Sequence, residues 1–433
     1  MTRQKLLEEL ELRLQERKRR GLWRALRSPG EAGAQDPAYE FASNDYLSFA
    51  RSPELEELTA KLVEEARWSG SLRNGSGGSR LLTGDSGFAH AVEKQIAHFH
   101  EAEACLLFNS GYDCNLGVFS CIAAAGRDVV LVDERVHASI HDGCRLSRAR
   151  TVRRFRHNDL TDLRESLSTL RKALGDECWI FVGVESCYSM DGDLLARPGE
   201  LLDMCGAFGA LLIVDEAHSV GVHGPDGRGL LHPYRAHPAL LARVVTFGKA
   251  FGLHGAAVLG AQPLLQYLLN YARPLIYSTS LPLHSLCAVS AAYRLMATET
   301  AAHRRKLLWE AVRMFHSLTR DLRSRCPQLP PPLVNRESPI QAIIIPGNEN
   351  CVFVANELRQ RGFDARPIRY PTVERGAERI RVVLHAHNTP EAINAFVQAL
   401  IDIVGQLPSA MCDARGTHQS GAPLRPALLN ARL

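Results

Sequence analysis

Several common sequence features are absent from this chain, and each absence narrows the possible functions. No two of its 11 cysteines form a Cys-x-x-Cys pair, so we expect reduced thiols in an intracellular compartment. The N-terminus has no apolar core of the kind a signal peptide needs. The two longest uncharged stretches, 250–272 and 274–293, are interrupted by Gly, Pro, His, Ser or Thr, so no membrane span is expected. A net charge of only +4 argues against a nucleic-acid partner and suits a small anionic substrate or cofactor.

Short apolar runs alternate with helical patterns between residues 104 and 260. A strand buried on both faces has a continuous apolar sequence, so this alternation predicts an α/β fold with a mostly parallel sheet. Ligands of such sheets bind beyond the carboxyl ends of the strands. That rule selects Asp133, Glu185, Asp215 and Thr246. The runs are ACLLF (104–108), VVLVD (129–133), WIFVGV (179–184), LLIVD (211–215), VVTF (244–247) and AAVLG (256–260).

The remaining pattern predicts four parts of the chain. Residues 1–45 form an N-terminal helical segment, with an amphipathic helix over 4–27 that docks on the surface. Residues 46–290 form the large domain. Residues 291–405 form a smaller C-terminal α+β domain, which a long helix over 284–322 introduces. Residues 406–433, rich in Pro, Ala, Gly, Ser and Arg, form a flexible tail.

Lys249 is the first candidate catalytic residue. It follows an apolar strand in a turn between Gly248 and Gly252, where glycine lets the backbone approach a ligand closely. An amine held in such a turn suits a Schiff base with pyridoxal 5′-phosphate (PLP). By itself the pattern fits a surface turn equally well.

The segment LIVDEAHSVG (212–221) strengthens this interpretation. PLP needs an acid facing its ring nitrogen and a donor near its ring oxygen. Asp215, at the end of a buried strand, and His218 can supply both from one turn. The alternative for Asp215 is a helix cap.

The letters DEAH at 215–218 also spell a box of nucleic-acid helicases. A helicase requires an upstream Gly-x-x-x-x-Gly-Lys-Ser/Thr loop. The one Gly-Lys pair, at Gly248 and Lys249, lies downstream, and Ala250 stands where Ser or Thr is needed. The helicase interpretation is therefore disfavoured.

Two further segments follow strand ends. His137 can stack on a flat ring; with His141 it also has the i, i+4 spacing of a metal pair, although no third ligand is evident. We favour stacking and expect no metal. Ser110, Gly111 and Tyr112 open a helix, where backbone N–H groups suit a phosphate. An ordinary strand-to-helix turn is the alternative there.

Taken together, these segments resemble the α-oxoamine synthases, PLP enzymes of transferase fold type I. The resemblance covers residues 5–405. It implies condensation of an amino acid with an acyl thioester and release of CO₂. The matching motifs are SNDYL (43–47), GSGGSR (75–80), SGY (110–112), HASIHDG (137–143), ESCYSMDGD (185–193), VDEAHSVGVHGPDGRG (214–229), TFGKAFG (246–252) and YSTS (277–280).

The resemblance also implies roles for individual residues. Lys249 holds the cofactor, Asp215 pairs with its ring nitrogen, His218 bonds its ring oxygen and His137 stacks on its face. The other implied cofactor contacts are Ser110, Gly111, Tyr112, Ser189 and Thr246. Ser278 and Thr279 are implied to reach the cofactor of a partner subunit, which implies a homodimer.

The segments GSGGSRLLTG (75–84), FRHND (155–159) and RYPTV (369–373) resemble the branch that joins L-alanine to a pimeloyl thioester. By the same matching, the implied substrate contacts are Arg24, Asn44, His137, Thr372 and Arg381. Another amino acid or acyl donor, or a non-catalytic partner subunit, are the alternatives. Lys249 and its matched partners argue against the non-catalytic one.

The chain ends in Ala431-Arg432-Leu433. This tripeptide resembles the Ser-Lys-Leu type of peroxisomal address, with two substitutions. We therefore expect a peroxisomal location and a peroxisomal import receptor as a partner, with the cytoplasm as the alternative.

Overall fold

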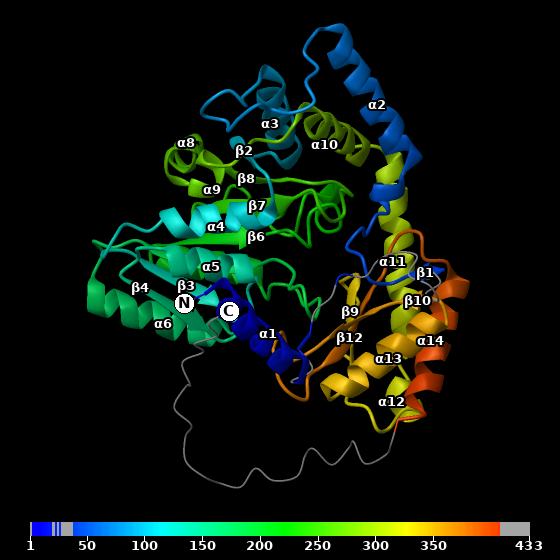
Figure 1. The fold of residues 1–433 in the computed structure, drawn as a ribbon. Coiled ribbons are helices and arrows are strands. Elements are labelled where there is room, and N and C mark those ends of the chain that lie inside the picture. The colour runs from blue at the N-terminus through cyan, green and yellow to red at the C-terminus, as the bar shows by residue number, and fades with distance from the viewer. Residues whose placement is uncertain (1, 20–21, 24–25, 27–37, 408–433) are drawn as a thin grey trace.

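The computed structural model describes residues 2–19, 22–23, 26 and 38–407 (Figure 1). Arg24 and residues 408–433, which include most of the predicted tail and the tripeptide 431–433, lie outside this range. The peroxisomal location and its receptor therefore stay predictions from the sequence.

A seven-stranded sheet forms the centre of the large domain, with the strand order β2-β8-β7-β6-β5-β3-β4. Only β8 runs antiparallel to its neighbours. The carboxyl ends of the other six strands therefore meet at one edge of the sheet. This confirms the predicted α/β class. The strands are β2 (Ala104–Phe108), β3 (Val129–Asp133), β4 (Thr151–Phe155), β5 (Ile180–Glu185), β6 (Ala210–Asp215), β7 (Leu240–Thr246) and β8 (Ala256–Gly260).

Strand β4 was not predicted, because its sequence TVRRF lacks a continuous apolar run. It pairs only with β3 and forms the sheet edge. Arg153 and Arg154 are exposed there. Charged residues on an edge strand discourage pairing with another chain.

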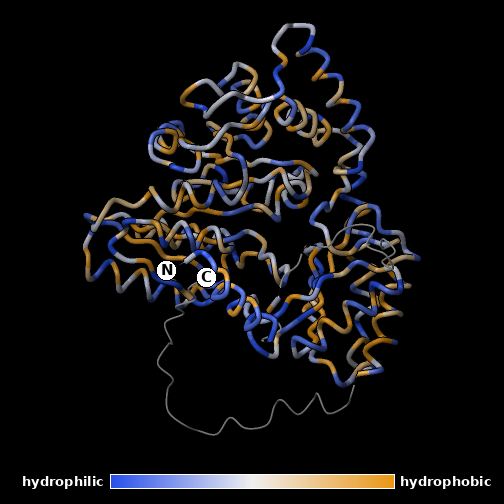
Figure 2. The backbone as a smooth tube through the Cα atoms, in the orientation of Figure 1, coloured by the Kyte–Doolittle hydropathy of each residue, from blue (hydrophilic) through white to orange (hydrophobic). Residues whose placement is uncertain are grey.

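Two apolar clusters cover the faces of the sheet. One joins the sheet to α4 (Gly111–Cys121), α5 (Ala138–Leu146) and α8 (Gln262–Tyr271). The other joins it to α6 (Leu160–Leu174) and α7 (Pro198–Ala207). Figure 2 shows the hydrophobic strands gathered between these layers.

The large domain has further helices, which are α2 (Pro53–Trp68), α3 (Gly87–His100), α9 (Arg273–Ile276) and α10 (Leu283–Met296). Helices α2, α3 and α10 pack together, with α3 against β2, and α9 packs against α4 and α8. The Ser86 side chain accepts a hydrogen bond from the Ala89 N–H and so caps α3.

The small domain contains an antiparallel sheet of order β11-β12-β9. Strand β1 (Tyr39–Glu40) pairs with β10, so this end of the predicted N-terminal segment belongs to the small domain. The elements are α11 (Glu299–Thr319), α12 (Leu322–Arg325), β9 (Ile340–Ile344), α13 (Asn348–Gln360), β10 (Phe363–Asp364), β11 (Arg366–Ile368), β12 (Arg379–Val383) and α14 (Pro390–Val404).

The single helix predicted over 284–322 is wrong. The chain forms α10, α11 and α12 instead. Thr298 has extended backbone angles, and its hydroxyl donates to the Leu295 carbonyl. This local bond competes with the helical ladder and separates α10 from α11.

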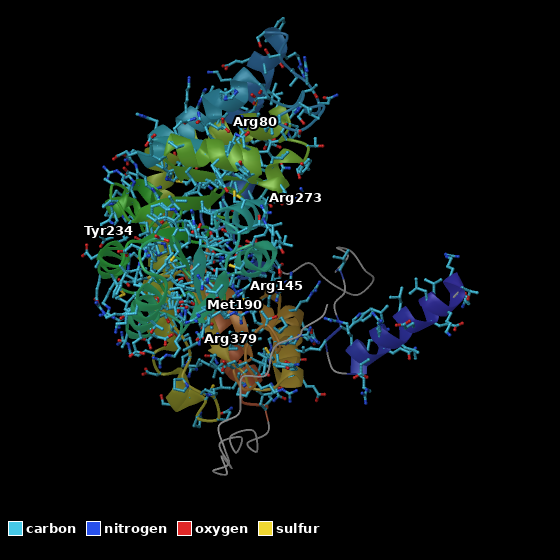
Figure 3. All side chains as sticks on the ribbon, turned by 90° about the vertical axis from the view of Figure 1, so that its left-hand side faces the viewer. Arg80, Arg145, Met190, Tyr234, Arg273 and Arg379 are labelled. Carbon is cyan, nitrogen blue, oxygen red and sulfur yellow. The ribbon has the colours of Figure 1, made fainter. Side chains whose placement is uncertain are left out.

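Helix α1 (Arg3–Arg19) ends earlier than the predicted 4–27 and does not dock. None of its residues is buried, and Figure 3 shows it standing apart from the body of the molecule. Leu6, Leu10, Leu12 and Leu14 are all exposed. The prediction of a surface-docked helix was wrong for this isolated chain. Within the described part, no helix is long and apolar enough to cross a bilayer.

Candidate active site

Lys249 lies in the turn after β7, partly buried. Burial lowers the pKa of its amine to about 8, against the opposing charges of Asp215 and Glu185. Gly252 in the same turn has φ +67, and a Cβ there would lie 2.2 Å from the Ala50 backbone nitrogen. Glycine is therefore required at this position. The amine is held near two carboxyl groups and is easily deprotonated.

Asp215 ends β6 and is buried. Its Oδ2 accepts a 2.7 Å hydrogen bond from Asn115 Nδ2, and its Oδ1 accepts a 2.9 Å bond from the Ala217 N–H. These bonds fix the orientation of the carboxylate. A buried carboxylate fixed in this way can pair with a protonated ring nitrogen.

His218 is buried, and its Nδ1 lies 2.5 Å from the Tyr46 hydroxyl. Burial, together with the charge of Lys249, lowers its pKa well below the ordinary value, so the imidazole is neutral. When Tyr46 donates to Nδ1, the ring proton lies on Nε2. His218 can then donate to a ligand oxygen, as predicted for it.

His137 precedes α5, with its side chain exposed. Its backbone N–H donates to Glu185 Oε1 over 2.5 Å, and its Nδ1 lies 2.8 Å from the Ser139 hydroxyl. Burial, with the charge of Asp215, raises the pKa of Glu185 well above its ordinary value. These contacts fix the imidazole, whose exposed face is available to stack on a ligand.

The N-terminus of α4 is the candidate anion site. Ser110 caps the helix by accepting from the Asp113 N–H over 3.1 Å. A Cβ on Gly111 would lie 3.5 Å from Thr246 Cβ, so this helix start touches the end of β7. Helix N-termini attract anions through their unpaired N–H groups and the helix dipole. Ser110, Gly111 and Thr246 thus meet where a phosphate fits.

Tyr112 links this site to His137. The two rings pack edge to face with centroids 6.2 Å apart, and the Tyr112 hydroxyl donates to Asp142. The N-terminus of α4 and His137 therefore border the same space.

The small domain contributes Arg381, which is buried at the junction of the domains. Its Nη2 donates to Asn44 Oδ1 over 2.9 Å, and its Nε donates to the Ser189 carbonyl over 2.7 Å. Asn44 Oδ1 is also 3.4 Å from the Tyr46 hydroxyl. Two predicted substrate residues are thereby linked, through Tyr46, to His218.

The glycine-rich loop 75–84 packs on the YSTS segment. Ser76 donates to the Ser280 carbonyl over 2.9 Å, and Ser280 donates to the Gly84 carbonyl over 2.7 Å. The Thr279 carbonyl accepts a 2.8 Å bond from Asn109, the residue before Ser110. Thr279, one of the two residues predicted to reach a partner's cofactor, therefore adjoins the N-terminus of α4 in its own chain.

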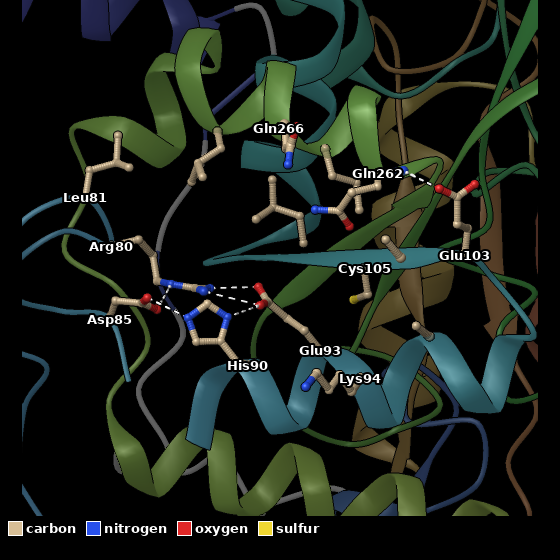
Figure 4. Close-up of a pocket in the computed structure, with 15 residues that line it drawn as sticks. Arg80, Leu81, Asp85, His90, Glu93, Lys94, Glu103, Cys105, Gln262 and Gln266 are labelled. Atoms are coloured by element: carbon tan, nitrogen blue, oxygen red, sulfur yellow. Dashed lines mark hydrogen bonds and ion pairs between the residues drawn. The ribbon is translucent and has the colours of Figure 1, made fainter. Parts of the chain in front are cut away.

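Arg80 anchors this loop from the other side (Figure 4). It donates to Glu93 over 2.8 Å and to Asp85 over 2.6 Å, and Glu93 also accepts from the Leu107 N–H at the edge of β2. The cavity of about 420 Å³ in Figure 4 includes no predicted cofactor residue. The ion pairs of Arg80 with Asp85 and Glu93 hold the glycine-rich loop in place.

Two predicted substrate residues are not brought into this group. Thr372 is exposed, and the structure describes no hydrogen bond from it to the other predicted site residues. Arg24 lies outside the described residues. Among the residues described, no cluster of three or more His, Cys, Asp or Glu could hold a metal ion.

Three residues orient the site without having been given a role from the sequence, although the strand-end rule had selected Glu185. Tyr46 contacts His218, Asn115 contacts Asp215 and Glu185 contacts His137. Tyr46 and Glu185 lie inside motifs already recognised. Asn115 stands one helical turn after Gly111, which is the only local signal that it faces the sheet.

The residues fit PLP in three respects. Asp215 is a buried carboxylate for the ring nitrogen, Lys249 is an amine of lowered pKa, and α4 begins with a cradle for a phosphate. The model of aminotransferases of class I and II matches residues 37–400. The chain belongs to this family.

Relatives place it more narrowly. It is 37% identical over 368 residues to the 8-amino-7-oxononanoate synthase of Emericella nidulans, covering 83% of this chain and 88% of the relative. It is 38% identical over 371 residues to the synthase of Methylococcus capsulatus, covering 86% and 90%. The predicted α-oxoamine synthase family is thereby confirmed.

Solved structures agree with this placement. A serine palmitoyltransferase from S. paucimobilis with bound PLP and myriocin superimposes with a TM-score of 0.79, at 25% identity, over 94% of this chain and 100% of that one. An 8-amino-7-oxononanoate synthase from Francisella tularensis gives 0.67, at 26% identity, over 87% and 99%. Fold type I is confirmed.

Proposed function

We propose that this chain is a PLP-dependent acyltransferase of biotin biosynthesis. It condenses L-alanine with pimeloyl-CoA, or with a pimeloyl carrier protein, to 8-amino-7-oxononanoate, CO₂ and the free thiol. The meeting of Lys249, Asp215 and His218 at one sheet edge carries the proposal. The 37% and 38% identities to synthases of this name support the choice of substrates.

PLP, when bound, stabilises the electron pair that the amino-acid Cα holds after it loses a substituent. Lys249 would hold PLP covalently. Asp215 would bind its ring nitrogen, His218 its ring oxygen, and Ser110, Gly111 and Thr246 its phosphate. The other predicted cofactor contacts are Tyr112, Ser189 and the stacking His137, together with Ser278 and Thr279 from a partner subunit.

The protein's own groups then handle substrate and protons. Arg381 binds the alanine carboxylate by charge and hydrogen bonding, with Asn44 beside it. The Lys249 amine, neutral above pH 8 because of its lowered pKa, removes the α-proton. His137 covers the reacting centre and donates to an oxygen of the acyl group. The alanine Cα then forms a bond to the acyl carbon while the C–S bond breaks and the thiol leaves. The carboxylate is lost as CO₂, and Lys249 returns a proton to the same carbon.

A second candidate is another α-oxoamine synthase with a different amino acid or acyl donor. The superposition on serine palmitoyltransferase, TM-score 0.79, is better than the 0.67 on 8-amino-7-oxononanoate synthase. Because of this better superposition, L-serine, glycine and long-chain acyl-CoA are the alternative substrates to test. The sequence identities favour L-alanine.

We also propose a homodimer with the active site at its interface. Its support is the helix α1, whose leucines are exposed on their own chain. A second copy would cover them, and Thr279 is exposed beside the N-terminus of α4, where a partner subunit can reach it.

Product analysis tests the proposed function. The PLP-loaded protein is incubated with L-alanine and pimeloyl-CoA, and 8-amino-7-oxononanoate and CoA are measured in equal amounts by mass spectrometry and thiol titration. L-Serine with palmitoyl-CoA is the comparison. Faster turnover of that pair would replace the proposal with the second candidate.

The pH dependence of PLP uptake is a further prediction. Only the neutral Lys249 amine can attack the aldehyde, and its pKa is lowered to about 8. The rate of covalent PLP uptake by the apoprotein should therefore rise with pH up to about 8 and then level off. Stopped-flow absorbance measures this rate. A rise that continues to pH 10 would contradict the lowered pKa.

A further inference from the structure

The turn after β5 joins the two domains through its backbone and side chains. Tyr188 and Asp193 pair across it, since the Tyr188 N–H donates to the Asp193 carbonyl over 2.9 Å. Ser189 and Asp191 lie between them. The turn therefore projects from the large domain toward β12.

The base of this turn is fixed to the large domain. His157 hydrogen-bonds Asp133 over 2.9 Å and contacts Asp193 with its other ring nitrogen. Burial opposes the charge of His157, but these hydrogen bonds outweigh it and raise its pKa to about 9. Asn158 Nδ2 donates to the Leu194 carbonyl over 3.0 Å. The turn cannot swing freely at its base.

The tip of the turn is bound by two arginines of β12. Arg379 contacts the Asp191 carboxylate, and Arg381 donates to the Ser189 carbonyl over 2.7 Å. Arg379 and Arg381 are two residues apart and project from one face of the strand. Figure 3 labels Arg379 beside Met190, the residue between Ser189 and Asp191.

Asp191 has a second partner, which leads to the stacking histidine. Its Oδ2 accepts a 2.9 Å hydrogen bond from Arg135 Nη1. Arg135 stands two residues before His137, in the turn after β3. The side chains of Arg379 and Asp191 are only 6% and 11% exposed, so their contact is little screened by water.

We propose that Asp191 is a positioning residue. Its carboxylate, bound by Arg135 and Arg379, sets the spacing between the turn that carries His137 and the strand that carries Arg381. It touches neither substrate nor cofactor. The inference rests on the proposed function, because Arg381 and His137 are its substrate residues.

This arrangement predicts a selective kinetic effect. An asparagine side chain at position 191 keeps one acceptor oxygen but loses the charge, so it cannot bind both arginines as Asp191 does. Arg381 and His137 then lose their fixed separation. For Asp191→Asn we expect KM for L-alanine to rise about tenfold while kcat falls by less than about threefold.

A paired variant separates positioning from stability. Asp191→Asn leaves Arg379 buried without its counter-charge, which lowers the melting temperature. In Asp191→Asn/Arg379→Gln the uncompensated charge is gone, so the melting temperature should recover while KM for L-alanine stays raised. Asp226→Asn, at an exposed aspartate, serves as the control. Recovery of KM together with stability would overturn the proposal.

Hydrogen exchange gives a readout that needs no substrate. Peptides covering residues 134–141 should exchange faster in both the single and the double variant, because each lacks the tie to Asp191. Unchanged exchange there in both would also overturn the inference. Absence of turnover in the unmodified enzyme, with faster exchange in the variants, would refute the proposed substrates alone.

Discussion

Replacing Lys249 by alanine should abolish turnover and covalent PLP attachment together. Lys249 has two proposed tasks, holding the cofactor and moving the α-proton of L-alanine. Loss of a positioned general base alone costs about 10² to 10⁴-fold. Because both tasks end, we expect kcat to fall by about 10⁴-fold. The measurements are product formation and the intact mass after borohydride treatment, which retains PLP only when it is covalently bound.

Lys172→Ala supplies the matched control, since Lys172 is exposed on α6. It should keep both turnover and the mass of the PLP adduct. The Lys249 variant should keep the fold, because its alanine replaces a turn side chain and not a core residue. An unchanged PLP adduct in Lys249→Ala would show that another lysine holds the cofactor.

The sheet could be predicted because its inner strands are covered on both faces. β3, β5 and β6 are almost wholly apolar, and burial on both sides demands such a sequence. The edge strand β4 does not have such an apolar sequence, because its Arg153 and Arg154 side chains are exposed to water. The end of α1 at Arg19 was not predicted either, because the amphipathic pattern of the sequence continues beyond the residue at which the helix ends.

Candidate site residues that lie next to the end of a strand could be placed from the sequence. Lys249, Asp215 and His218 each stand within a few residues of β6 or β7, so local sequence indicates their place. Tyr46 and His218 are 172 residues apart. No local pattern reports such a contact, which only the packed domains create.

The contacts of Asp191 were even harder to predict from the local sequence. Its partners lie 56 and 188 residues away, and one belongs to each domain. The motif ESCYSMDGD drew attention to the turn but could not say that its tip is bound from two sides. Substrate contacts at a domain junction are therefore harder to predict than the cofactor contacts of one sheet edge.

Asp215→Asn should lower kcat by about 10³-fold, which corresponds to about 4 kcal/mol of transition-state stabilisation. The substitution keeps the shape of the side chain and removes its charge. A neutral amide cannot hold a proton on the PLP ring nitrogen, so the cofactor stabilises the carbanion poorly. KM for L-alanine should change little, because Asp215 faces the cofactor and not the substrate.

The structural cost of this substitution is smaller and can be measured separately. The oxygen of the introduced amide can still accept from Asn115, but its NH₂ group then faces the Ala217 N–H, and that 2.9 Å hydrogen bond is lost. One such bond contributes about 1 kcal/mol to the free energy of unfolding. Thermal melting should show this modest loss in Asp215→Asn and none in Asp203→Asn, whose side chain is 81% exposed. A kcat within tenfold of the unmodified enzyme would show that the Asp215 charge does not support the reaction, and the proposed ring-nitrogen contact would be wrong.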